Sequence, residues 1–268
     1  MTKIIEGYLK VAPAVMFDGD VATIDSQSVY YRQLNEAVRD AIAAGAKTVR
    51  LTRVNGQRYI GTGVAGSDVR IEIDGVPGSD MAIFMDGPTV VVSGNAQDGV
   101  GNTMNAGRVI INGDAGDVIG YGMRGGTVLI RGDVGYRVGI HMKAYESMRP
   151  TVVCGGKARD FFGEYMAGGM LVLLGMDTQF PDQPLVGSFC GTGMHGGKMY
   201  LRCEELPIDL PVQVEATPAT AEDMAEIDAH LDSFCESFDL SKKEVLSKPF
   251  FVLRPNTKNP YKSLYTFN

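Results

Sequence analysis

The residues best suited to chemistry in this sequence lie near its middle. Arg137, His141 and Lys143 share one short segment, and alternation along the chain predicts that their side chains leave the same side. Such a group could bind an anion, or it could form an ion pair with Asp160 or Glu164 one repeat further along. A solvated or partner-facing stripe is the alternative interpretation of the same residues.

Two histidines invite a metal-site interpretation. His141 and His195 each lie beside a repeated methionine, and Glu164 falls between them in the sequence. Their spacing matches no ligand motif, and two histidines without a third ligand are a weak zinc site, so hydrogen-bonded structural histidines are favoured. The sequence therefore indicates an interface or anion-binding face, and we assign no catalytic, cofactor-binding or metal-ligating residue. The residues of that face are Arg137, His141, Lys143, Glu164 and His195.

Other side-chain groups make weaker reaction centres. Asp160 and Glu164 could form an acid–base pair. However, Asp98, Asp117 and Asp160 occupy the same position in different repeats, which is typical of side chains that cap chain bends. Residue 2 is threonine, so we do not expect an N-terminal cysteine nucleophile, and the sequence has no Gly-x-Ser-x-Gly elbow.

The cysteine spacing and the net charge argue against several classes of metal-binding and nucleic-acid-binding protein. None of the four cysteines belongs to a Cys-x-x-Cys pair, so neither an iron–sulfur cluster nor a zinc ribbon is predicted, and we expect free thiols in a reducing cytoplasm. The isoelectric point near 5.0 and the formal net charge of −7 argue against nucleic acid or an anionic membrane as partner. No signal peptide or membrane span is predicted. The cysteines are Cys154, Cys190, Cys203 and Cys235.

A repeat positions all of these residues. Its unit is Gly-x-x-Met-x-x-Gly, and the chain holds four full copies and one partial copy without the closing glycine. No copy ends in Lys-Ser and each leads into a strand-like run, so a solenoid bend explains the glycines better than a nucleotide-binding loop. The structural repeat residues are Gly101, Met104 and Gly107; Gly120, Met123 and Gly126; Gly163, Met166 and Gly169; Gly191, Met194 and Gly197; and, in the partial copy, Gly139 and Met142.

Short apolar triplets set the period of this repeat. They begin at residues 71, 90, 109 and 128, which are 19 residues apart, and then at 152, 171 and 199. This period is too short for a strand–helix–strand unit and is close to one turn of a parallel β-helix. Insertions at 144–149 and 177–184 account for the longer intervals. The repeated methionine is expected to stack on its equivalent in the next coil, inside the solenoid.

The flanking segments differ from the solenoid, and the N-terminal one is expected to cap one of its ends. Leu34, Val38 and Ala41 have helical spacing before a strand that starts at Thr48. Thr220 begins a second helix, and an aromatic, proline-rich stretch after Pro249 is expected to be extended.

We therefore predict a mainly β fold, a single-stranded right-handed parallel β-helix of about seven coils. The predicted segments are an N-terminal α+β cap at 1–66, the β-helix at 67–206, and a C-terminal helix with a docking tail at 207–268.

Several glycine-rich motifs resemble one known family. The chain is similar to the C-terminal GXGXG domain of the glutamate synthase large subunit from about Ile24 to Tyr265. One component of formylmethanofuran dehydrogenase and of related formyltransferase complexes shares this type of domain. The motifs that carry the resemblance are Asn55–Gly61, Gly94–Gly107, Gly135–Lys143, Gly163–Gly169 and Gly191–Gly197.

The resemblance implies a stand-alone subunit of a split glutamate synthase that is not catalytic by itself. Such a complex performs the glutamine-dependent reductive amination of 2-oxoglutarate. The implied partners are an amidotransferase subunit and a synthase subunit that binds FMN and iron–sulfur clusters, because no residue here matches the family's nucleophilic cysteine, flavin contacts or cluster cysteines. This chain would couple those subunits and bind no cofactor itself.

Three alternatives stay open at the level of sequence. The chain could be a component of a formyl-transfer complex, or the GXGXG subunit of a system related to glutamine synthetase or N-methylglutamate synthase. It could also be an independent enzyme whose site lies on the face around His141 and His195. The sequence leaves homo-oligomerisation open.

Overall fold

The computed structural model describes residues 12–206 and 209–256 of the 268-residue chain. Its strands are β1 (Val15–Asp18), β2 (Val21–Asp25), β3 (Thr48–Asn55), β4 (Arg70–Val76), β5 (Asp86–Val92), β6 (Ala106–Ile111), β7 (Thr127–Ile130), β8 (Thr151–Cys154), β9 (Ala167–Leu173), β10 (Gly196–Arg202), β11 (Val214–Pro218) and β12 (Phe250–Pro255). Its helices are α2 (Tyr31–Ala43), α3 (Ala221–Phe238) and α4 (Lys242–Val245).

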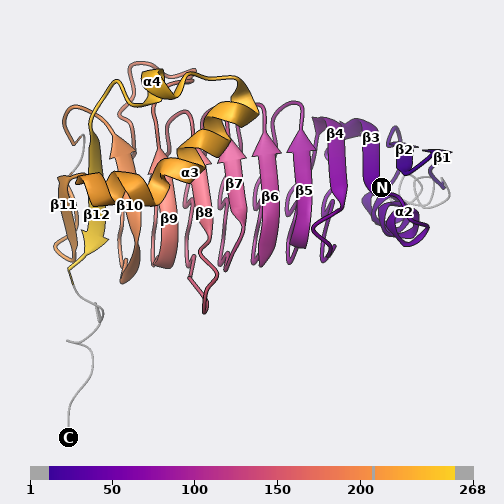
Figure 1. The fold of residues 1–268 in the computed structure, drawn as a ribbon, viewed down its shortest axis with the longest axis horizontal. Helices are drawn as coiled ribbons and strands as arrows, with labels where there is room; N and C mark the ends of the chain where they lie inside the picture. The colour runs from indigo at the N-terminus through magenta and orange to yellow at the C-terminus, as the bar shows by residue number, and fades with distance from the viewer. Residues whose placement is uncertain (1–11, 207–208, 257–268) are drawn as a thin grey trace, which may run out of the picture.

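A parallel ladder from β4 to β10 forms the body of the molecule (Figure 1). Each predicted triplet lies in register with the next, so that Ile71 pairs with Val90 and Val90 with Val109. The register continues across both insertions, because Val128 pairs with Val152 and the first residues of the last two triplets also align. The prediction of a β-solenoid is confirmed, with about six turns between its seven triplet strands.

The interior of the solenoid is filled from two sources. The first and third residue of every triplet point inward and are buried in one continuous core. A Cβ atom built on Gly101 would lie 3.8 Å from the Sδ atom of Met104 and 3.9 Å from that of Met123, so methionines of successive coils do lie side by side. All five repeated methionines are fully buried in the same core: Met104, Met123, Met142, Met166 and Met194.

The opening glycines of the repeat form a corner with left-handed backbone, a conformation that glycine adopts at least cost. Ala82 and Gly61 hold the same corner position in the two coils that precede the first full motif. Ala82 replaces the opening glycine there, so the triplets at 71 and 90 indicate that coil although the Gly-x-x-Met unit does not. The opening glycines, all with φ between +69° and +73°, are Gly101, Gly120, Gly139, Gly163 and Gly191.

The closing glycines have a steric reason as well as a left-handed backbone. A Cβ atom built on Gly126 would lie 2.6 Å from the Cε atom of Met104 and 2.8 Å from the carbonyl oxygen of Gly107. Gly197 is crowded in the same way by Met166, at 2.6 Å. A side chain at this position would therefore push against the methionine of the preceding coil. The closing glycines are Gly107, Gly126, Gly169 and Gly197, with φ between +79° and +101°.

The partial copy of the repeat follows the same plan up to its methionine. Met142 is fully buried like its equivalents, and the insertion that begins at Ala144 stands where the closing glycine would follow. The repeat glycines and methionines are thus parts of the corner and the core. Because the methionines have no exposed surface, they belong to the scaffold and are not candidates for binding a partner or a ligand.

The aspartates expected to cap bends do so. The Oδ1 atom of each of these aspartates accepts a hydrogen bond from a backbone N–H of the following coil, at 2.9 Å from Asp98 to Asp117 N and 2.8 Å from Asp160 to Ser188 N. Asp117 makes the equivalent contact with Tyr136 N at 2.9 Å. These carboxylates therefore bind backbone donors, which supports the structural interpretation over an acid–base pair.

The N-terminal segment forms the helix and strand that the spacing predicts. Leu34, Val38 and Ala41 are buried on one side of α2, and β3 begins at Thr48. β2 and β3 pair in parallel with each other and β3 pairs with β4, so the sheet continues through residue 66 without interruption. The sheet therefore has no break at residue 66, where the sequence predicts a boundary between segments.

The C-terminal segment covers the other end of the molecule. The predicted helix is α3, which lies across the outer face of the sheet (Figure 1). The extended stretch is confirmed as β12, which pairs antiparallel with β10 and with β11. The rest of the predicted tail, 257–268, lies outside the described residues. Within 12–206 and 209–256, no helix is long and apolar enough to cross a bilayer.

Candidate functional site

Two residues of the predicted face, Arg137 and Glu164, form an ion pair between successive coils. The Nη1 atom of Arg137 donates a hydrogen bond to Oε2 of Glu164 on the next coil. The Glu164 side chain is only 7% exposed, whereas that of Arg137 is 41% exposed. The Arg137 guanidinium also lies over the ring of Phe161, 4.2 Å from its centroid. Of the two predicted carboxylate partners, the structure therefore selects Glu164.

His141 stands in a stack of aromatic rings. Its imidazole lies parallel to the ring of Tyr165, with centroids 5.2 Å apart. On its other side, the ring of Tyr121 meets it edge-on at 5.9 Å. The three residues come from three successive coils, so the repeat period sets their separation.

Lys143 and His195 share a different position of the coil, directly after the repeated methionine. The coil between them places Ala167 there, so the two side chains are not adjacent. His195 Nδ1 lies 3.0 Å from the carbonyl oxygen of Gly193, as a structural histidine would. The structure thus brings together Arg137 and Glu164, and leaves His195 apart from them.

Aromatic residues complete the face, and the sequence analysis missed them. Phe161 and Phe189 stack with centroids 4.9 Å apart. Phe189 is 58% exposed, which is unusual for so large an apolar side chain. A signal existed, because both residues lie two positions before a repeat glycine. We call this surface the aromatic–basic face. It consists of Tyr121, Arg137, His141, Phe161, Glu164, Tyr165 and Phe189, together with the exposed Lys143, which follows His141 by two residues.

The described residues offer few reactive groups. Within 12–206 and 209–256, no three His, Cys, Asp or Glu side chains lie close enough to hold a metal ion. The four cysteines are free thiols. Burial raises the pKa of Cys190 to about 12, and burial together with the charge of Asp133 raises that of Cys154 further. Neither buried thiol is a competent nucleophile at neutral pH, because the thiolate is the reactive form.

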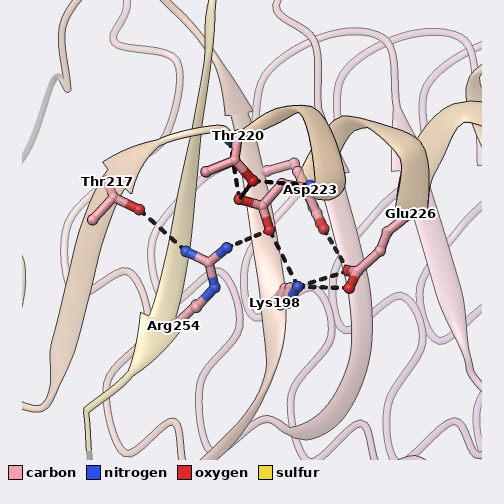
Figure 2. Close-up of polar contacts among 7 residues, drawn as sticks. Lys198, Thr217, Thr220, Asp223, Glu226 and Arg254 are labelled. Atoms are coloured by element: carbon pink, nitrogen blue, oxygen red, sulfur yellow. Dashed lines mark hydrogen bonds and ion pairs between the residues drawn. The ribbon is translucent and has the colours of Figure 1, made fainter.

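A second polar cluster, which the sequence did not reveal, fastens α3 to the sheet (Figure 2). Asp223 forms a capping box with Thr220, and its side chain is 4% exposed. Its Oδ1 atom accepts hydrogen bonds from Arg254 on β12 and, at 3.2 Å, from Lys198 on β10. Lys198 also donates to both carboxylate oxygens of Glu226 at 2.7 and 2.8 Å. Tyr200 donates a hydrogen bond to Glu226 at 2.9 Å. We call these residues the Asp223 cluster: Lys198, Tyr200, Thr217, Thr220, Asp223, Glu226 and Arg254.

Charge pairing sets the protonation of this cluster. The hydrogen bond from Arg254 is the largest effect that holds the pKa of Asp223 well below its usual value, and bonds from Thr220 and Lys198 act the same way against burial. Burial, followed by the hydrogen bond to Glu226, raises the pKa of Tyr200 well above its usual value. An ionised Asp223 and a neutral Tyr200 are a stable structural arrangement, and neither is poised to exchange a proton near neutral pH.

Comparison with known proteins agrees with this geometry. A family model described as the GXGXG motif matches residues 33–254, which include every triplet strand and α3. The uncharacterized protein MJ1350 of Methanocaldococcus jannaschii is 45% identical over 249 residues, which cover 91% of this chain and 95% of that protein. The resemblance seen in the motifs is therefore confirmed. The chain belongs to the GXGXG motif family, that of the C-terminal domain of the glutamate synthase alpha subunit.

Proposed function

We propose that this protein is a structural subunit of a glutamate synthase-type complex. In that role it holds an amidotransferase subunit against a synthase subunit that binds FMN and iron–sulfur clusters. The complex would use glutamine nitrogen to aminate 2-oxoglutarate reductively, in the cytoplasm. This chain would contribute rigid geometry and contact surface, while its partners would contribute the cofactors and the reacting groups.

One observation carries the proposal: the ionisable groups that the structure brings together are all engaged in holding the fold. Asp98, Asp117 and Asp160 bind backbone N–H groups, and Glu164 and Asp223 are buried in ion pairs. A general acid or base needs a pKa near the working pH and access to a substrate proton. Glu164 and Asp223 are buried away from any substrate, and the more exposed aspartates each already accept a backbone hydrogen bond that fixes a bend, which favours a supporting role for the chain.

Rigidity supports the same role. Each coil pairs with its neighbours through the triplet ladder, and the corner adds backbone hydrogen bonds such as Gly120 N to Val100 O at 2.8 Å. A closely hydrogen-bonded solenoid with an interdigitated core deforms little. Ammonia transfer between two active sites requires that they keep a fixed separation, and a stiff rod meets that requirement.

The test is reconstitution with the partner subunits of the same organism. The chain should co-purify with the flavin-bearing and amidotransferase subunits, and glutamine-dependent glutamate formation should need all three. By itself the chain should neither hydrolyse glutamine nor reduce a dye. Turnover by the isolated chain would contradict the proposal. Association only with molybdopterin-type or amidohydrolase subunits would indicate a formyl-transfer complex instead.

A further inference from the structure

We propose that the aromatic–basic face docks a partner subunit through a segment of that partner that carries carboxylates beside an apolar side chain. The inference rests on the proposed function, since it identifies where the structural subunit holds one of its partners. It is argued from the exposed aromatic rings of this face, from its basic side chains and from the left-handed backbone that carries them.

The rings of this face are partly or fully exposed and are stacked in pairs. Phe189 lies on Phe161, and Tyr165 lies on His141, so four rings from three coils form two short stacks. Aromatic residues and arginine are the types most enriched at the centres of protein interfaces. Stacking restrains the rings before binding, so little side-chain entropy is lost when a partner covers them.

The shape of the face favours a macromolecular partner. Four of its side chains, those of Tyr121, His141, Lys143 and Phe189, are exposed to solvent. Small ligands bind mainly in concave sites that bury most of their surface. Phe189 and Tyr121, which are both exposed, would instead be covered by a flat or complementary protein surface.

The charge of the face selects the chemistry of the partner. The formal net charge of the whole chain is −7, so most of its surface repels acidic proteins. Arg137 and Lys143 outnumber Glu164 on the face, and Glu164 is already paired with Arg137. An acidic segment would therefore be attracted to the basic residues of this face.

The backbone shows that these side chains are not required by the fold. Arg137, His141 and Phe189 have φ between +54° and +61°, where glycine is less strained than any of them. Glycine with the same left-handed conformation holds this corner in some other coils, whereas Asp80, Phe84, Thr103 and Val118 hold it elsewhere. The corner therefore accepts many residue types, and the rings and the arginine of this face are not needed to form it. Those glycines are Gly99, Gly122 and Gly193.

The experiment compares two double variants for binding to each partner subunit in turn. The face variant combines Phe189→Ala with Lys143→Glu, which changes two exposed residues and leaves the buried Glu164 paired. The control combines Phe84→Ala with Arg39→Glu. Phe84 is 52% exposed and has a left-handed φ of +56°; it holds the same corner position as His141 but lies three coils earlier, away from the face. Circular dichroism should give unchanged melting temperatures for both variants.

We expect the face variant to bind one partner subunit about tenfold or more weakly, measured by titration calorimetry, while the control binds like the unmodified chain. The affinity of the unmodified chain should fall more steeply with salt than that of the face variant.

Equal affinity of the face variant and the unmodified chain would overturn this inference and leave the proposed function standing. An equal loss in both variants would overturn it as well, because the effect would not belong to the face. If the unmodified chain bound neither partner subunit, the proposed function itself would fail, and this inference with it.

Discussion

The outer face of the sheet differs between its two halves. Over β7 to β10 it is covered by α3, and the middle residues of the triplets there are fully buried, among them Leu129, Val153 and Tyr200. Over β4 to β6 the equivalent residues are only half buried, and one of them is the charged Glu72. The inner face is apolar in both halves. The solenoid therefore requires apolar residues only on its inner face. The outer residues are apolar where α3 covers them and more polar where they are exposed.

The largest effect should come from Asp223, which fastens the cover. Asp223→Ala should lower the free energy of unfolding by about 3–5 kcal/mol, because it removes a buried carboxylate and leaves Arg254 and Lys198 without it. Urea denaturation would measure the loss, and hydrogen exchange should show α3 released before the ladder. Asp228→Ala is the matched control on the same helix, since its ion pair with Lys242 is exposed and should contribute under about 1 kcal/mol.

Similar losses for Asp223→Ala and Asp228→Ala would mean that α3 is held by its apolar stripe alone. The comparison between the two halves would then rest on packing, without any contribution from the Asp223 cluster.

A smaller effect should separate the halves directly. Val153→Ala on β8 removes two methyl groups from beneath α3 and should cost about 2 kcal/mol, because a cavity remains. Val91→Ala makes the same change at the middle of the β5 triplet, where the side chain is half exposed, and should cost under about 1 kcal/mol. Chemical denaturation of both variants gives the difference. Equal costs would show that the open half is covered in solution.

Acidification should lower the stability of the covered half by less than Val153→Ala does. Burial, and then the charge of Arg108, lowers the pKa of His230 on α3 from its usual value near 6.5. The unfolded chain then binds more protons than the folded chain just below that value, so stability should fall as the pH drops below about 6.5. The loss between pH 7.5 and 5.5 should be smaller than that of Val153→Ala, measured by urea denaturation. In His230→Gln the same pH change should have less effect.

The smallest effect should come from the charged residue of the open half. Glu72 accepts hydrogen bonds from Arg50 at 2.8 Å and from Arg70 at 2.7 Å, and all three side chains are partly exposed. Glu72→Val gives β4 the residue that β5 has at this position, and should change the free energy of unfolding by no more than about 0.5 kcal/mol. A melting temperature several degrees lower would show that these pairs are needed to keep the open half folded.

Periodicity made most of the fold predictable. The triplets beginning at Ile71, Val90 and Val109 lie in register because each coil repeats the same inward pattern, and a shift of one residue would expose that pattern. The helical stripe that ends at Phe238 and the cap at Thr220 were likewise visible, since local spacing specifies them. The face around Arg137 was found because its residues are close in sequence.

Its aromatic members were harder to predict. Phe161 and Phe189 are 28 residues apart, because the insertion at 177–184 lengthens the coil between them. They stack because the strands on either side of that insertion still pair in register. The position of each residue relative to a repeat glycine carried the signal, but the residue types themselves do not repeat.

By itself, the sequence determined the coil period, the inward-facing residues and the left-handed glycine corner, because these follow from rules that act within one or two coils. Only the tertiary structure determined which part of the outer face α3 covers and which charged side chains meet beneath the helix. Lys198, Asp223 and Arg254 belong to three segments with no common period, and they meet because the chain returns over its own sheet. The insertion at 177–184 also depends on a contact between distant segments. The Nζ atom of Lys157 donates a hydrogen bond to the carbonyl oxygen of Phe180 at 2.9 Å. Contacts of this kind depend on where the chain returns in space, which no local spacing specifies.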